Sequence, residues 1–233
     1  MLSSNYPKYD VIVVGGGHAG SEAAAAAAGM GSKTLLITMN LQTIGQMSCN
    51  PAIGGVAKGQ IVREIDALGG IMGKVTDQAS VQFRMLNLSK GPAMWSPRAQ
   101  CDRMLYAQLI REALESIPTL HFRQDNVVEI LINEDKEVYG VKTQVGQVYH
   151  ADNIIVTSGT FLNGLIHIGE NQYGGGRSGE RASTGITECL IKYGFEAGRL
   201  KTGTPPRLDG RSIDYSKLEI QYGDENPKSF SFS

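Results

Sequence analysis

The sequence predicts an α/β fold in which a parallel sheet is joined to an antiparallel β-meander. Two observations predict the parallel sheet: residues 11–14 form a short apolar, β-branched run, and a second run follows at 33–38. Short continuous apolar runs are typical of parallel strands, which are buried on both faces. A third observation predicts the meander, because segments 127–132, 138–144 and 147–150 have strand character and are separated by turns.

The first strand runs into a glycine-rich turn, Gly15-Gly16-Gly17-His18-Ala19-Gly20, and then into an alanine block at 23–28 that predicts a helix. The three outer glycines have the spacing G-x-G-x-x-G. The first permits a tight turn, the second lets the backbone approach a pyrophosphate, and the third lets the helix pack closely on the strand. Because strand, turn and helix follow one another directly, we predict that Gly15 to Gly20 bind the diphosphate of a dinucleotide at the helix N-terminus.

The identity of the dinucleotide is constrained by a missing acidic residue. A ribose-binding Asp or Glu is usual at the end of the second strand, yet no acidic residue occurs between Glu22 and Glu64. The ribose hydroxyls must then be met by Thr38, Asn40 or backbone. This weakens the case for a plain NAD dehydrogenase and leaves FAD open. The Gly54-Gly55 pair, which would let backbone touch a flat ring, favours FAD.

Helical periodicity predicts a helix from about Ala57 to Leu68 and another from about Ser96 to Ser116. The first carries an apolar stripe of Ile61, Ile65 and Leu68. The second begins with Ser as N-cap and Pro at the first helical position, which is a favourable combination. The stretch between the two helices is mixed and suggests only short strands.

The last elements define the expected domains. Residues 153–157 predict a further strand, which returns the chain to the parallel sheet, and 184–193 predict a short helix. No regular element is predicted after Asp209. We expect an FAD-binding Rossmann-like domain at 1–165, of the two-dinucleotide-binding-domain type and with an incomplete sheet. From Leu165 the character of the sequence shifts to connecting loops.

Composition excludes several classes of protein. The net charge is −1, which gives no nucleic-acid signal for the whole chain, although residues 171–207 carry six Lys or Arg against three acids. The three cysteines lack metal-ligand spacing, so we expect no metal site and reduced thiols in a cytosolic protein. Residues 1–9 are polar and no apolar run approaches 18 residues, so we expect neither a signal peptide nor a membrane span.

Four stretches resemble the MnmG (GidA) family of tRNA uridine carboxymethylaminomethyl-modification enzymes. They are the glycine turn, Gly45-Gln46-Met47-Ser48-Cys49-Asn50-Pro51-Ala52-Ile53-Gly54-Gly55, Ser158-Gly159-Thr160-Phe161-Leu162-Asn163-Gly164, and Gly198-Arg199-Leu200-Lys201-Thr202-Gly203-Thr204-Pro205-Pro206-Arg207. The resemblance covers essentially the whole chain in order, and the second and fourth stretches are the most specific. Family members are much longer, so the resemblance implies an N-terminal fragment that is inactive alone. It also implies that residues 166–233 begin an inserted domain with its connecting loops.

The resemblance implies an FAD-containing cytoplasmic enzyme that forms homodimers and acts on tRNA with a GTPase partner, MnmE. Together they place an aminomethyl or carboxymethylaminomethyl group on carbon-5 of the wobble uridine. Methylenetetrahydrofolate supplies the one-carbon unit and NADH reduces the flavin. The resemblance also assigns FAD contacts to Gly15–Gly20, Val128 and Ser183. The residues by themselves predict only a core strand residue at Val128 and a plain helix N-cap at Ser183.

Cys49 is the candidate catalytic residue. Uracil carbon-5 becomes nucleophilic when a group adds to carbon-6, and a thiolate is the usual agent. Cys49 follows the second strand, in the turn-rich stretch expected to face the isoalloxazine; the alternative is a small buried hydrophobe. Two positions depart from the family pattern: Cys101 stands where Ala is common, so no catalytic role is expected of it, and Trp95 stands where Arg is common. Four basic residues are candidates for phosphate contacts or plain surface charges: Arg177, Arg199, Lys201 and Arg207.

Other functions stay open at this point. An FAD-dependent disulfide reductase would need Cys-x4-Cys after the second strand, but Gly54 stands five residues beyond Cys49. The related folate- and FAD-dependent tRNA uridine methyltransferase shares the cofactors, and another FAD/NAD(P)H oxidoreductase would share the glycine turn. A nucleotide-binding scaffold without redox work would lack a flavin band that bleaches with NADH.

Overall fold

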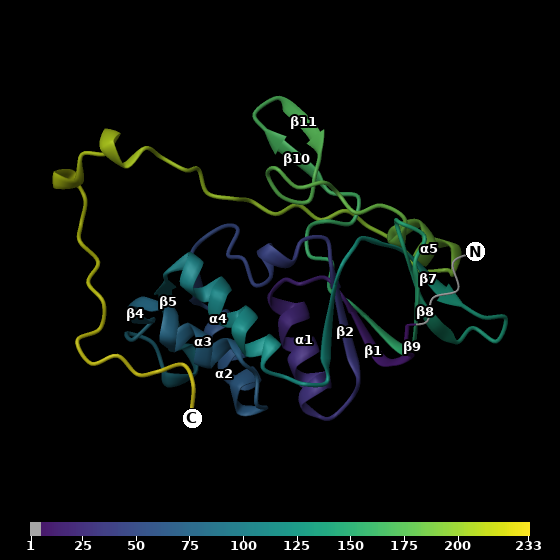
Figure 1. The fold of residues 1–233 in the computed structure, drawn as a ribbon. Coiled ribbons are helices and arrows are strands. Elements are labelled where there is room, and N and C mark those ends of the chain that lie inside the picture. Colours follow the sequence, from purple (N-terminus) through teal and green to yellow (C-terminus); the bar gives the residue numbers. More distant parts are fainter. Residues whose placement is uncertain (1–5) are drawn as a thin grey trace.

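The computed structural model describes residues 6–233, so most of the polar N-terminal stretch considered for a signal peptide, residues 1–5, lies outside the described residues. The chain forms a six-stranded main sheet beside a layer of helices and a smaller sheet (Figure 1). In spatial order the strands of the main sheet are β6 (Leu120–Gln124), β2 (Thr34–Thr38), β1 (Tyr9–Val14), β9 (Val148–Val156), β8 (Val138–Thr143) and β7 (Val127–Ile132). Within residues 6–233 no helix is long and apolar enough to cross a membrane.

The main sheet combines the predicted parallel and antiparallel parts. Strands β6, β2, β1 and β9 pair in parallel, and β7, β8 and β9 form an antiparallel meander. One expectation was wrong: the segments 147–150 and 153–157 are a single strand, β9. Its first residues pair with β8, and Ala151 to Val156 continue beside β1. The meander therefore enters the parallel sheet without a break.

Helices and the meander cover opposite faces of the parallel strands. Val13 and Leu36 belong to a core shared with the helical layer, whereas their neighbours along the strands face the meander. This alternation follows from the two-residue period of a strand. The helices are α1 (His18–Gly29), α2 (Lys58–Ala67), α3 (Met72–Ala79), α4 (Arg103–Glu115) and α5 (Ile186–Lys192). Of these, α5 packs on the meander side through Ile186.

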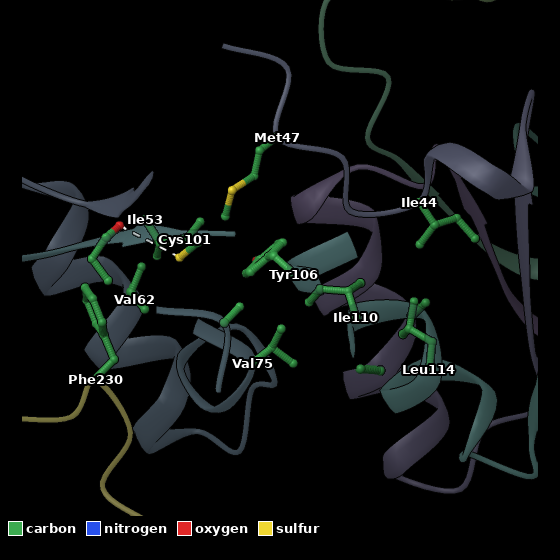
Figure 2. Packing of buried hydrophobic residues seen from close by; sticks show 14 of the residues in the cluster. Ile44, Met47, Ile53, Val62, Val75, Cys101, Tyr106, Ile110, Leu114 and Phe230 are labelled. Atoms are coloured by element: carbon green, nitrogen blue, oxygen red, sulfur yellow. Dashed lines mark hydrogen bonds between the residues drawn. The ribbon is translucent and has the colours of Figure 1, made fainter. Parts of the chain in front are cut away.

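Helix α4 forms the centre of the helical core. Tyr106, Ile110 and Leu114 recur at four-residue spacing and are fully buried, so they form one apolar face of the helix. Figure 2 shows these three side chains along α4, with Met47 on one side of Tyr106 and Val75 nearby. Burying side chains of this size stabilises the fold by about 1.5–3 kcal/mol each.

The predicted start of this helix was wrong. Residues 96–101 form a strand, β5 (Ser96–Cys101), and α4 begins only at Arg103. Asp102 is the true N-cap, because its carboxylate accepts hydrogen bonds from the amides of Met104 and Leu105 at 2.9 and 3.0 Å. Strand β5 lies between β3 (Ala52–Gly54) and β4 (Ser80–Leu86) in a three-stranded antiparallel sheet. Pro97 is the second residue of β5, lies opposite Met85 of β4 and precedes the residues of β5 that pair with β3.

The buried face of α2 also differs from the predicted stripe. Val62 is only 5% exposed, whereas Ile61 and Leu68 are 53% and 90% exposed. Helix α2 turns its glycine toward β5: a Cβ on Gly59 would collide with the carbonyl oxygen of Pro97. Close approach through this glycine selects a face that apolar periodicity does not reveal.

Helix α3 was not predicted at all. Its first amides are capped from a distant element, since the carboxylate of Glu22 in α1 accepts hydrogen bonds from the amides of Ile71 and Met72 at 3.2 and 2.6 Å. No local N-cap signal marks this start, which explains why the sequence around 71–86 suggested only short strands.

The C-terminal third contains little regular structure. A two-stranded hairpin of β10 (Leu165–Ile168) and β11 (Asn171–Gly174) stands away from the main sheet (Figure 1). After α5 the chain runs extended across the molecule and returns to the helical layer, where Phe230 is buried. The prediction of no regular element after Asp209 holds, apart from two short 3-10 turns at 210–212 and 215–217.

Candidate active site

The candidate site lies where the parallel strands end. The loops that follow β1, β2, β6 and β9 all leave the same edge of the sheet, because parallel strands share one direction. After β1 the chain turns toward β2 on one side, and β9 occupies the other side. Such a switch point in an open parallel sheet is the usual place for a dinucleotide.

The glycine turn has the geometry that its spacing predicts. Gly15 has a φ of 111°, and a Cβ there would lie 2.6 Å from the carbonyl oxygen of Thr157. A Cβ on Gly20 would collide with the carbonyl oxygen of Gly15, so this glycine lets α1 pack directly on the turn. A Cβ on Gly17 would meet no atom within 4 Å. The second glycine therefore faces open space, as a ligand-approach position requires.

The N-terminus of α1 is left without a side-chain cap. Gly17 is the N-cap residue, and His18 and Ala19 form the first turn with no acidic residue in it. The free N–H groups and the helix dipole favour an anion here. Three buried side-chain atoms also lack hydrogen-bond partners among the described residues: His18 Nδ1 and Ser21 Oγ in α1, and Ser158 Oγ in the loop after β9. These features fit the diphosphate of a dinucleotide such as FAD.

His18 is held neutral beside this turn. Burial lowers the pKa of its imidazole, and the positive charge of Arg177 lowers it further. The ring meets Tyr106 edge-on, with 5.7 Å between the ring centroids. Burial in turn raises the pKa of the Tyr106 hydroxyl above its ordinary value. The positive charge of Arg177 therefore acts at the turn beside a neutral imidazole.

Val128 and Ser183 lie together although 55 residues separate them in the chain. The hydroxyl of Ser183 donates a hydrogen bond to Asn126 Oδ1 at 2.8 Å, and Gly185 packs against the carbonyl of Val128. The expected role of Ser183 as a helix N-cap was wrong, because Gly185 is the N-cap of α5. The Ser183 hydroxyl is instead bonded to Asn126, in the loop that precedes β7.

This pair is linked to the glycine turn through the second strand. The amide of Asp125, next to Asn126, donates to the carbonyl of Thr38 at 2.9 Å. The side chain of Thr38 in turn lies 3.1 Å from the position that a Cβ on Gly16 would take. The structure thus brings the predicted cofactor residues to one edge of the sheet.

Cys49 lies in an irregular loop between β2 and β3. Its side chain is exposed, so the interpretation as a small buried hydrophobe was wrong. Arg103 donates to the Cys49 carbonyl at 3.2 Å, and Arg207 donates to the Ser48 carbonyl at 2.9 Å. The thiol lies 3.8 Å from the hydroxyl of Thr204. An accessible thiol is thereby presented on a loop held by two cationic side chains.

The other two thiols are not available for chemistry. Cys101 is buried, and burial raises the pKa of its thiol to about 11. Cys189 is half-buried in α5 and donates to the carbonyl of Ile130. All three cysteines lie within residues 6–233, and Cys49 alone is exposed.

The comparisons with known proteins identify the family. The family model described as "Glucose inhibited division protein A" matches residues 10–233. The chain belongs to this family. A relative from Christiangramia forsetii, named tRNA uridine 5-carboxymethylaminomethyl modification enzyme MnmG, is 66% identical over 226 residues, which are 97% of this chain and 36% of the relative. A relative of the same name from Salinibacter ruber is 64% identical over 99% of this chain and 35% of its own length.

A solved structure of the GidA family has the same fold. GidA from Aquifex aeolicus superimposes with a TM-score of 0.92 at 52% identity, over 97% of this chain and 37% of that chain. The predicted α/β fold with its parallel sheet and meander is thereby confirmed. The chain spans about a third of the length of the GidA-family relatives that it matches.

Arg177 is a basic residue of this GidA-family chain whose charge acts on His18 of the glycine turn. It donates to Gln46 Oε1, pairs with Glu180 at 3.3 Å and stacks over the ring of Phe161. Gln46 follows Gly45, whose amide is bonded to the glycine turn. Arg199 donates to the Asn163 carbonyl instead, and Lys201 is exposed. Composition could not separate these four basic residues, because their partners come from distant loops.

Thr157 and Arg103 were missed by sequence reasoning. The hydroxyl of Thr157 lies 2.9 Å from the Val14 carbonyl and 3.1 Å from the Gly15 carbonyl, so it fixes the start of the turn. Arg103 is the first residue of α4 and reaches the Cys49 loop from there. The position of Thr157 at the end of a predicted strand could have indicated that it lies near the glycine turn. Nothing in the local sequence indicates that Arg103 contacts the Cys49 loop.

Proposed function

We propose that the full-length protein is an FAD-dependent enzyme that modifies the wobble uridine of tRNA. With a GTPase partner, MnmE, it adds an aminomethyl or carboxymethylaminomethyl group to carbon-5. Membership of the GidA family and the names of the relatives support the proposal. The observation that carries it is the position of an exposed thiol, Cys49, on the loop whose Gly45 amide is bonded to Gly16 of the dinucleotide turn at 2.9 Å.

We propose that FAD is the cofactor of this site. The amides at the start of α1 and residues Gly15 to Gly20 would hold its diphosphate, and the open space at Gly17 and the orphaned Ser158 hydroxyl support this. Val128 and Ser183 would contact it further along the same edge. When bound and reduced, the flavin supplies the redox chemistry that uridine alkylation needs. NADH as reductant and methylenetetrahydrofolate as carbon source complete the proposal.

Cys49 would activate the base. Its thiolate adds to carbon-6 of uracil, and the electron pair of the carbon-5–carbon-6 double bond moves onto the carbon-4 carbonyl as an enolate. The enolate attacks the one-carbon electrophile through carbon-5. Loss of the carbon-5 proton to water and expulsion of the thiolate then restore the ring. A cysteine suits this role because its thiolate both adds and leaves readily.

The assembly and the domain division are part of the same proposal. We propose a cytoplasmic homodimer in which an FAD-binding domain over 1–165 is followed by the start of an inserted domain at 166–233. The end of the main sheet at Val156 and the separate hairpin that starts at Leu165 support a boundary there. Contacts of Ser183, Ile186, Arg207 and residues 221–233 with the first domain cross this boundary.

Reconstitution tests the proposed function. The full-length protein is incubated with the GTPase, GTP, unmodified tRNA, NADH, methylenetetrahydrofolate and an amine donor, and the nucleosides are analysed by mass spectrometry. We expect a wobble uridine that carries the aminomethyl or carboxymethylaminomethyl group. Formation of 5-methyluridine would instead identify the folate-dependent methyltransferase, and NADH consumption with unchanged tRNA would identify another oxidoreductase.

A further inference from the structure

The extended segment 199–233, called the strap here, contacts the Cys49 loop on one side and the sheet behind it on the other. After α5 this segment crosses the molecule and ends against the helical layer (Figure 1). Most of its residues are exposed, and its regular structure consists of two short turns. Its few buried contacts therefore fix its course.

Near its start the strap contacts the backbone of the Cys49 loop. Arg207 donates to the Ser48 carbonyl at 2.9 Å, and the Thr204 hydroxyl lies 3.8 Å from the Cys49 sulfur. From the opposite element, α4, Arg103 donates to the Cys49 carbonyl at 3.2 Å. Residues 47–50 lack helix or strand structure, so their carbonyls depend on partners from elsewhere.

Behind the loop the strap is anchored in the core. The amides of Phe230 and Ser231 donate to the carboxylate of Asp77 at 2.7 and 2.9 Å. The ring of Phe230 packs edge-on against Phe83, and a Cβ on Gly54 would lie 2.7 Å from it. Figure 2 shows Phe230 beside Ile53 and Val62 at the end of the core cluster. Gly54 ends β3, the strand into which the Cys49 loop runs.

We propose that Arg207 and Arg103 are positioning residues for Cys49. Two guanidinium groups hold consecutive carbonyls, one from the strap and one from α4, and so fix the peptide that carries the thiol. A guanidinium suits this task because its donors lie in a rigid plane and its charge persists at every working pH. The inference rests on the proposed function of Cys49, but the order of the loop can be measured without activity.

Hydrogen exchange of the full-length, flavin-bound protein tests the positioning. Arg207→Gln should make the amides of Gly45 and Gln46, which are hydrogen-bonded at the start of this loop, exchange faster by about tenfold or more, because the loop loses a partner. Arg211→Gln is the matched control, since Arg211 lies on the same strap and bonds only to the side chain of Asp209. Arg103→Gln provides an independent variant from α4. Equal exchange rates in Arg207→Gln and Arg211→Gln would overturn the proposal.

Kinetics separate positioning from tRNA binding. Arg207→Gln should lower kcat by about tenfold or more at unchanged KM for tRNA, since a misplaced thiol loses transition-state interactions only. Arg207→Lys keeps a charged donor and should recover most of kcat. A raised KM at normal kcat would overturn the proposal and make Arg207 a tRNA contact. If Cys49→Ser is fully active, the proposed catalytic role of Cys49 fails, while the exchange result still reports whether Arg207 orders the loop.

Discussion

The amide of Gly45 donates a hydrogen bond to the carbonyl oxygen of Gly16 at 2.9 Å. This bond joins the loop after β2, which carries Cys49, to the glycine turn after β1. A ligand that displaces the turn must therefore also move the cysteine loop. The relationship makes the cofactor site and the thiol parts of one unit, and the predictions that follow test its parts separately.

Gly17→Ala and Gly20→Ala should affect the protein in different ways. Gly17 has a φ of −77° and open space at its Cβ position, so Ala should fold normally while its methyl group obstructs the ligand. FAD affinity should fall about tenfold or more, which corresponds to about 1.4 kcal/mol. Gly20→Ala should instead lower the free energy of unfolding by about 1–3 kcal/mol, because its Cβ collides with Gly15.

Flavin titration and urea unfolding of the two variants check this contrast. Unchanged FAD affinity in Gly17→Ala would mean that the diphosphate does not approach this glycine. Wild-type stability in Gly20→Ala would mean that α1 packs less closely on the turn than the structure shows.

Cys49→Ser should reduce tRNA modification at normal flavin content. A hydroxyl is a far poorer nucleophile than a thiolate at neutral pH, so we expect a loss of at least about tenfold in rate, or about 1.4 kcal/mol in barrier. Cys189→Ser is the control, because that thiol is half-buried in α5 and bonded to the Ile130 carbonyl. Modification rates that are the same in both variants would exclude Cys49 as the nucleophile.

Cys101 should make stability fall at alkaline pH. Burial raises the pKa of its thiol to about 11, above the value of about 9 for an unperturbed thiol. The folded state thus favours the protonated thiol. This contribution is fully present below pH 9 and is lost as the pH rises toward 11. Urea unfolding from pH 8 to 10.5 should show a steeper loss for the wild type than for Cys101→Ala. Parallel curves would contradict the assignment.

Phe230→Ala should destabilise the helical layer. Phe230 is 0% exposed and packs against Phe83, and removing such a ring costs about 3–5 kcal/mol. Phe232→Ala is the matched control, because Phe232 is 69% exposed two residues away. Chemical denaturation of both variants measures the difference. Similar losses in both would mean that the strap is not anchored through Phe230.

The sequence was sufficient where local signals agree with the fold. The run from Val11 to Gly20 combines a strand, a turn and a helix start, and all three formed as predicted. The meander followed from its turns. The failures have non-local causes: α3 is capped by Glu22 of another helix, and α2 selects its buried face through contact of Gly59 with Pro97.

In the candidate site, too, local sequence predicts some features, and others depend on distant segments. The spacing of the glycines encodes the conformation of the turn, so sequence reasoning could place it. The exposure of Cys49 and its contacts with Arg103 and Arg207 arise from segments 54 and 158 residues away, and no local pattern encodes them. The hydroxyl of Ser183 likewise points to Asn126 rather than to the helix that follows it.

Covalent trapping tests the central claim most directly. The full-length protein is incubated with its GTPase, its co-substrates and tRNA that carries 5-fluorouridine at the wobble position. Fluorine at carbon-5 replaces the proton whose loss would release the enzyme, so the adduct should persist. After nuclease and trypsin digestion, mass spectrometry should find the nucleotide on peptide 34–58, in which Cys49 is the only cysteine. An adduct on another peptide, or none at full flavin occupancy and normal turnover of uridine tRNA, would contradict the account.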